Sequence, residues 1–93
     1  MASFTTRVEL HGAERTDYDL LHQKMAAQGF SRIITADDGK RYWLPPAEYN
    51  YEAAATRAQV LAKAQAAAAQ VKTSFAVIVT ESEGRTWIGL QAA

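Results

Sequence analysis

The chain has 93 residues, of which 48% are hydrophobic, and these values predict one globular domain, residues 1–93, rather than a disordered segment. Its ten basic residues equal its ten acidic residues, so any nucleic-acid or membrane partner must meet a local charged patch. The chain lacks cysteine, which excludes disulfides and thiolate metal sites and suits the cytoplasm. No apolar run reaches the roughly 20 residues of a membrane span, so we expect a cytoplasmic protein without a membrane partner.

The N-terminal segment predicts a half-buried strand. Phe4, Thr6, Val8 and Leu10 alternate with polar residues, which is the period-2 pattern of a strand with one face in the core. A signal peptide is continuously apolar instead. Gly12 then ends the pattern.

The first helix is expected to begin near Thr16, because Thr16 and Asp19 have capping-box spacing. Its core residues recur at helical intervals and are Tyr18, Leu21 and Met25. Gly29 is well placed to end the helix, since glycine readily adopts the left-handed conformation of a helix C-terminus.

A hairpin is predicted from residue 30 onwards. The segment "FSRIITA" reads as a strand, and Asp38-Gly39 favours a two-residue type I′ turn, after which a third strand begins at Lys40. This register pairs Ile34 with Trp43. It assigns Ile33, Thr35, Tyr42 and Leu44 to a helix-covered face, and it assigns Arg32, Ile34, Arg41 and Trp43 to an uncovered face. Trp43 is therefore predicted to be a surface aromatic flanked by arginines.

Pro45 and Pro46 interrupt the third strand, because proline donates no backbone hydrogen bond. The segment "AEYNYEA" follows, with Tyr49 and Tyr51 on one side. We expect an aromatic arm that either reaches over a neighbouring subunit or folds back on its own domain.

The second helix should begin at Thr56, which has capping-box spacing to Gln59. The apolar face of this helix carries short side chains and consists of Val60, Ala64, Ala67 and Val71. The strand "SFAVIVT" is nearly all apolar and predicts burial on both faces. A turn at Glu83-Gly84 leads to a last predicted strand, "RTWIGL". The order predicts an α+β, ferredoxin-like β-α-β-β-α-β fold with an extra C-terminal strand and two helices on one face of an antiparallel sheet.

Three roles for Trp43 remain open. It can stack a nucleic-acid base while neighbouring arginines hold phosphates. It can act as a protein–protein hot spot, where Trp and Arg are enriched. It can also simply cover Ile34. The neutral net charge, and a first strand that offers Thr5, Arg7 and Glu9 where RNA-binding sheets carry aromatics, favour a protein interface.

His22 is the candidate catalytic residue. It is the only histidine in a predicted helix, and an imidazole can take the proton of a ribose 2′-hydroxyl. The other histidine, His11, ends the first strand. Asp37 and Asp38 form an acidic pair, but Asp-Gly is what the turn itself requires. The sequence contains no histidine or carboxylate cluster with ligand spacing, and we expect neither a metal site nor a cofactor.

The sequence resembles the GhoS family of small bacterial antitoxins in short segments between residues 3 and 80. These segments are "FTTRVEL", the helix end "M…GFSRI", the turn "DDGKRYWLP", the aromatic "YNY" and an alanine-rich helix before an apolar strand. The resemblance implies a ferredoxin-like domain, related in shape to the Cas2 nucleases, that cleaves its toxin's own transcript without a known cofactor. The family's first helix carries an arginine implicated in cleavage, whereas this sequence has His22 and Lys24 there.

Two functions follow as expectations. The first is a GhoS-like antitoxin, an RNA-cleaving enzyme that acts on toxin mRNA through His22. The second is a non-enzymatic, dimeric protein-binding module, such as a mobile-element or phage-borne inhibitor. Both use the same candidate binding residues, which are Arg32, Lys40, Arg41, Trp43, Tyr49 and Tyr51. We expect a homodimer, with mRNA or a protein as partner, and no DNA partner.

Overall fold

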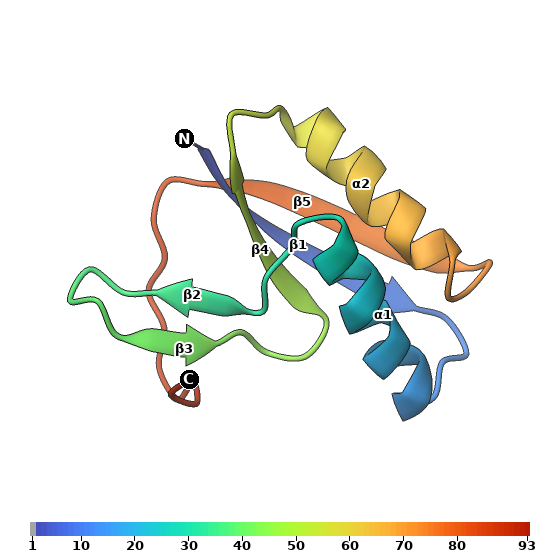
Figure 1. The fold of residues 1–93 in the computed structure, drawn as a ribbon, viewed down its shortest axis with the longest axis horizontal. Coiled ribbons are helices and arrows are strands. Elements are labelled where there is room, and N and C mark those ends of the chain that lie inside the picture. The colour runs from blue at the N-terminus through green and yellow to red at the C-terminus, as the bar shows by residue number, and fades with distance from the viewer. Residues whose placement is uncertain (1) are drawn as a thin grey trace.

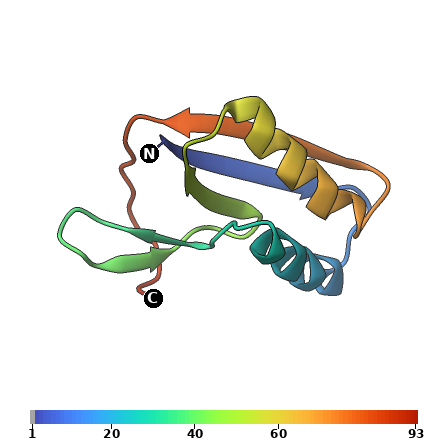
Figure 2. The same ribbon diagram turned by 45° about the horizontal axis from the view of Figure 1, so that its top comes forward.

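Five strands and two helices make up the computed structural model, which describes residues 2–93. In chain order they are β1 (Ala2–Leu10), α1 (Arg15–Ala27), β2 (Ile33–Thr35), β3 (Arg41–Trp43), β4 (Glu48–Ala53), α2 (Arg57–Ala69) and β5 (Phe75–Ser82). The predicted α+β class is confirmed. Figures 1 and 2 show both helices on one side of β1, β4 and β5, with the β2–β3 hairpin extending beyond the sheet.

The strands divide into two antiparallel sheets. One has three strands in the order β4-β1-β5, and the other is the β2–β3 hairpin. The ferredoxin-like strand order is not confirmed, because β2 pairs with β3 instead of joining the three-stranded sheet as a regular strand. Only an isolated bridge from Ser31 to Asn50 links the start of this segment to β4.

The core lies between β1 and the helices. The predicted inward set of β1 is confirmed, since Phe4, Thr6, Val8 and Leu10 are all buried. They face Leu21 and Met25 of α1 and the methyl-rich face of α2, formed by Val60, Ala64, Ala67 and Ala68. The short alanine side chains allow the α2 backbone to lie close to β1 and β5.

The start of α1 differs from the prediction. The N-cap is Glu14 rather than Thr16, and the Glu14 backbone N–H donates to Asp17 Oδ2 over 2.9 Å. This bond holds the pKa of Asp17 below its usual value, and Lys72, whose Nζ lies 3.3 Å from Asp17 Oδ2, adds to the effect. Asp17 can reach back to the first residue of the helix cap, so Asp17 completes the cap in place of the predicted Asp19.

The end of α1 confirms the role of Gly29, whose φ is 94°. The Phe30 N–H donates to the Met25 carbonyl and the Gly29 N–H to the Ala26 carbonyl, which is the Schellman arrangement. Met25 and Phe30 are both buried, so the cap also closes over the core. The second helix begins as predicted: the Gln59 N–H donates to Thr56 Oγ1, and the Thr56 N–H donates to Gln59 Oε1.

The predicted hairpin register is wrong by one residue. Ile34 pairs with Tyr42, and Ile33 pairs with Trp43. The cause is a three-residue loop in place of a two-residue turn: Gly39 N–H donates to the Ala36 carbonyl, and Gly39 then takes a φ of 87°. As a result Ile34 lies on the buried side of the hairpin, at 3% exposure, instead of beside Trp43 on the open side.

The prediction that β5 is buried on both faces is wrong. β5 lies at an edge of the three-stranded sheet, and its residues alternate between half-buried and exposed. Ala76, Ile78 and Thr80 face the side without helices. An apolar β-branched run therefore occurs here on a strand with one open face.

The predicted last strand, residues 85–90, does not form. The chain leaves β5, crosses to the hairpin and bonds to β3, where Trp43 N–H donates to the Gln91 carbonyl and Ala93 N–H to the Arg41 carbonyl. Trp87 packs against Tyr42 with ring centroids 5.5 Å apart. The C-terminal segment thus extends the small hairpin sheet rather than the main one.

The segment after the prolines folds back on its own domain. It forms β4, which pairs with β1 from Ala53 to Glu48. Tyr49 is a core residue with 1% exposure, and Tyr51 packs against Phe30 at 4.9 Å between ring centroids. Of the two expected positions of this segment, the structure has the one within its own domain.

Candidate functional site

The predicted catalytic residue His22 lies beside the hydroxyl of Tyr49. His22 occupies the middle of α1, and its Nδ1 is 2.6 Å from the Tyr49 hydroxyl oxygen on β4. The two rings are tilted, with centroids 5.7 Å apart. Because Tyr49 is anchored in the core, this hydrogen bond fixes the orientation of the half-buried imidazole.

The charge of Arg32 acts on both His22 and Tyr49. Burial lowers the pKa of His22 below its usual value, and the Arg32 cation lowers it further, while Asp19 opposes the change. Burial raises the pKa of Tyr49 well above its ordinary value, with Arg32 acting in the opposite direction. At neutral pH the cluster therefore holds a neutral imidazole, a protonated phenol and a cation. We call His22, Arg32 and Tyr49 the His22 cluster.

The Arg32 guanidinium also lies over the indole of Trp43, with Cζ 5.4 Å from the ring centroid. Within residues 2–93, its buried Nε has no hydrogen-bond partner. Arg32 thus connects the His22 cluster to the exposed tryptophan. Because Nε is buried, an anion such as a phosphate would be met by the terminal N–H groups of the guanidinium, whose planar arrangement suits a phosphate.

A groove of about 530 Å³ continues from this point, and we call it the Trp43 groove. Its walls come from the hairpin and from the C-terminal segment: Arg32, Trp43, Leu44, Pro45, Pro46, Gly89, Leu90 and Gln91. Trp43 is 38% exposed and lines the groove, so part of its side chain is accessible to a ligand. The groove combines an aromatic surface with a cation, which is what a stacked nucleotide requires.

The other predicted binding residues lie elsewhere. Lys40 and Arg41 are exposed and line a separate depression of about 320 Å³ with the C-terminal residues Ala92 and Ala93. Tyr51 is half-buried among core aromatics and lies close to Gly29. The structure therefore joins His22 to Tyr49 and Arg32 to Trp43. Lys40 and Arg41 line a different depression, and Tyr51 is part of the core.

Sequence reasoning missed Arg85. Its side chain crosses the helix-free face of the sheet, where Nε donates to Thr5 Oγ1 over 3.0 Å and Nη2 donates to Asn50 Oδ1 over 2.5 Å. Burial lowers its pKa and Glu52 opposes the change. The only signal in the sequence was a basic residue just after a turn, and residues 85–90 were expected to be a strand.

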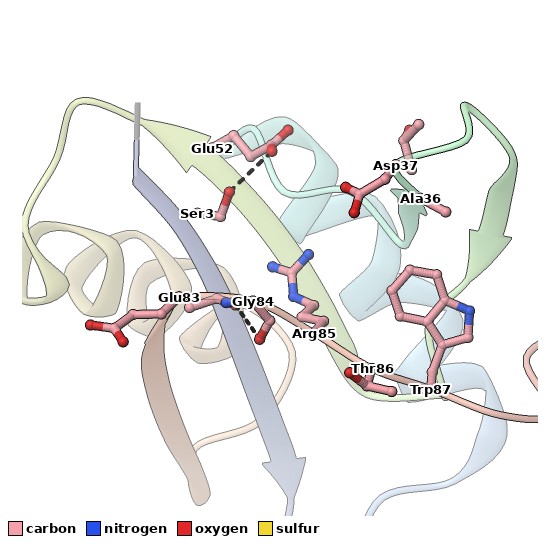
Figure 3. Close-up of a pocket in the computed structure, with 11 residues that line it drawn as sticks. Ser3, Ala36, Asp37, Glu52, Glu83, Gly84, Arg85, Thr86 and Trp87 are labelled. Carbon is pink, nitrogen blue, oxygen red and sulfur yellow. Dashed lines mark hydrogen bonds between the residues drawn. The ribbon is translucent and has the colours of Figure 1, made fainter.

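Arg85 lines a pocket of about 480 Å³. Figure 3 shows its guanidinium between Glu52 on one side and Asp37 and Trp87 on the other. The pocket is lined by residues from the ends of β1, β2, β4 and β5, from the hairpin loop and from residues 83–87. Since the guanidinium donates to groups of β1 and β4, we interpret Arg85 as a bridge that fixes the C-terminal segment to the sheet.

The described residues also bear on two possible functions, metal binding and membrane spanning. Across residues 2–93, no three histidine or carboxylate side chains come together in a way that would hold a metal ion. Within the same residues, neither helix has the length and apolar character needed to cross a membrane.

Comparisons with protein families, with curated proteins and with solved structures gave no match to this chain. The resemblance to the GhoS family therefore stays a prediction.

Proposed function

We propose that the protein is a GhoS-like antitoxin that binds toxin mRNA and cleaves it as a metal-independent endoribonuclease. The observation that carries the proposal is the 2.6 Å contact between His22 Nδ1 and the Tyr49 hydroxyl, beside the Arg32 cation. Because its pKa is lowered, His22 is neutral at physiological pH, which is the state that a general base needs.

The proposed reaction is an attack by a ribose 2′-oxygen on the adjacent phosphorus. His22 Nδ1–H donates to the Tyr49 oxygen, which leaves the lone pair of Nε2 free to take the 2′-hydroxyl proton. The new bond between the 2′-oxygen and phosphorus forms as the bond from phosphorus to the 5′-oxygen breaks. The leaving oxygen takes a proton from water, and the products carry a 2′,3′-cyclic phosphate and a 5′-hydroxyl.

Arg32 and Trp43 have supporting roles in this proposal. The Arg32 guanidinium binds the phosphate and stabilises the negative charge that develops on its oxygens. The accessible part of the Trp43 side chain stacks a neighbouring base in the groove, and such a contact contributes about 1–3 kcal/mol. Single-stranded RNA offers both groups together with the 2′-hydroxyl that the proposed reaction requires.

The ferredoxin-like architecture is part of the same proposal. The Ser31–Asn50 bridge is closed by two backbone hydrogen bonds of 2.8 and 2.7 Å, so residue 31 continues the sheet beyond β4. Counting this residue as a short strand gives the spatial order residue 31, β4, β1, β5. This count supports the proposal of a split βαβ domain in which β2 is diverted into a hairpin.

The test is cleavage of mixed-sequence, single-stranded RNA oligonucleotides in the presence of a chelator. We expect wild-type protein to yield 2′,3′-cyclic phosphate ends, and His22→Gln to lose about 10²–10⁴-fold in rate. His11→Gln is the matched control, since His11 is an exposed histidine whose Nδ1 contacts Ser74. Full activity in His22→Gln, or activity that appears only after magnesium is added, would contradict the proposal.

A second candidate function is a protein-binding module, and the exposure of Trp43 beside Arg32 favours it. Large aromatic and Arg side chains are typical anchors of protein interfaces. In that case Trp43→Ala costs about 2 kcal/mol or more of association with the partner, while RNA affinity is negligible for both variant and wild type. RNA binding by the wild-type protein that weakens in Trp43→Ala separates the first function from the second.

A further inference from the structure

The outer edge of β5 is an unusually open strand edge. Within residues 2–93, the eight residues of β5 pair with β1 on one side and with no strand on the other. They contain a single charged residue, Glu81, and no proline. Strand edges of monomeric proteins are normally short, charged, bulged or covered, because their free N–H and C=O groups are a template for pairing.

The opposite edge of the same sheet is paired at one position. There Asn50, in the middle of β4, exchanges two backbone hydrogen bonds with Ser31. Figure 1 shows the hairpin on the β4 side and α2 alongside β5. Among residues 2–93, no strand pairs with the outer edge of β5. Pairing at one edge but not at the other indicates that the β5 edge has its own partner.

Ile78 marks the centre of this edge. It lies near the middle of β5, on the face without helices, and 62% of its surface is exposed. If a second β5 pairs antiparallel with Ile78 opposite its own copy, Val77 lies opposite Val79 and Ala76 opposite Thr80. Every pair near the centre is then β-branched or small, a composition that favours sheet pairing.

The charges around β5 also suit an antiparallel copy. Lys72 precedes the strand, whereas Glu81 and Glu83 lie at its end. Antiparallel pairing brings the basic end of one strand next to the acidic end of the other, at both ends of the interface. Lys72 also contacts Asp17 of its own chain, so its cation is held near the start of β5.

We propose that two copies of this chain associate through β5, antiparallel and about a twofold axis at Ile78. The two three-stranded sheets then form one continuous six-stranded sheet, and the outward backbone groups of each β5 are hydrogen-bonded. Such an interface is isologous and closes at the dimer. The inference does not depend on RNA cleavage, and it places the dimer contact on a surface remote in sequence from Trp43.

The first test is sedimentation of the full chain at micromolar concentration. Wild-type protein is expected to sediment as a dimer. Ile78→Lys is expected to weaken the dimer at least about tenfold, because it places two like charges opposite one another. Ile88→Lys is the matched control, since Ile88 is 97% exposed and lies outside β5. A monomeric wild type would overturn the proposal. So would a dimer that survives Ile78→Lys but dissociates in Ile88→Lys or Trp43→Ala.

The second test needs no variant. Amide hydrogen exchange of wild-type protein is measured at two concentrations that span the dissociation constant. The outward-facing half of the β5 amides is expected to become protected as concentration rises, while the amides paired with β1 stay unchanged. Concentration-independent exchange along β5 would overturn the proposal even if Ile78→Lys does not fold.

Discussion

At the scale of single residues, Tyr49 links the core to the candidate site. Its ring is buried under α1, and its hydroxyl contacts His22. Because burial raises the pKa of Tyr49, the hydroxyl stays protonated at neutral pH and can both donate and accept. The position of the His22 ring is therefore set by packing, and changes in the core around Tyr49 affect the site directly.

The pKa of His22 can be measured by NMR titration of its ring. We expect a midpoint below the ordinary value of 6.5, because burial and Arg32 both disfavour the charged form. Arg32→Met should move the midpoint upward but not as far as 6.5, since the burial of the imidazole remains. The unfolded chain binds the proton first as pH falls through 6.5, so this group lowers the free energy of unfolding in acid. A midpoint above 6.5 in the wild type would contradict the prediction.

Gly29 is the residue with the most restrictive backbone position. Its φ of 94° is unfavourable for other residues, and an added Cβ would lie 3.2 Å from the Tyr51 ring. Gly29→Ala should lower the free energy of unfolding by about 1–2 kcal/mol in urea titration. The control is Gly84→Ala, at a position with open space around it. Equal losses in the two variants would show that the cap of α1 contributes nothing specific.

At the scale of elements, the sequence predicted several features of individual strands and helices. The alternation of β1, the spacing of Leu21 and Met25, and the cap at Thr56 all reappear in the structure, because each depends on neighbours within a few residues. The hairpin register did not follow, since Asp38-Gly39 suits a two-residue turn and equally a three-residue loop with Gly39 in the left-handed region. The burial of β5 depends on strand order, which no local pattern contains.

The close packing of α2 gives a prediction at this scale. Ala64 is fully buried against the sheet, and a larger side chain there must displace the helix. Ala64→Leu is expected to lower the free energy of unfolding by about 1–3 kcal/mol in urea titration. Ala66→Leu introduces the same side chain at an exposed position of the same helix and should have little effect. Equal stability of the two variants would mean that α2 is loosely packed.

At the scale of the whole molecule, the candidate site is assembled from distant parts of the chain. His22, Arg32 and Trp43 were recognised in the sequence by their chemistry and predicted exposure. The contact between His22 and Tyr49 was not, because it joins α1 to β4 across 27 positions. Arg85 lies 80 positions from Thr5, and its bridge over the sheet was equally inaccessible to local patterns. The net charge of zero is an average over the whole chain and does not describe the candidate site, where Arg32 supplies a positive charge.

The central place of β1 has a consequence for how the protein is made. β1 is synthesised first, but its two neighbours in the sheet are β4 and β5. During translation, one edge of β1 therefore has no strand partner until residues 48–53 emerge from the ribosome. The other edge of β1 has none until residues 75–82 emerge. Pairing of such distant segments is slow compared with helix formation. The nascent chain can form α1 early, whereas the three-stranded sheet can be completed only after residues 75–82 have been made.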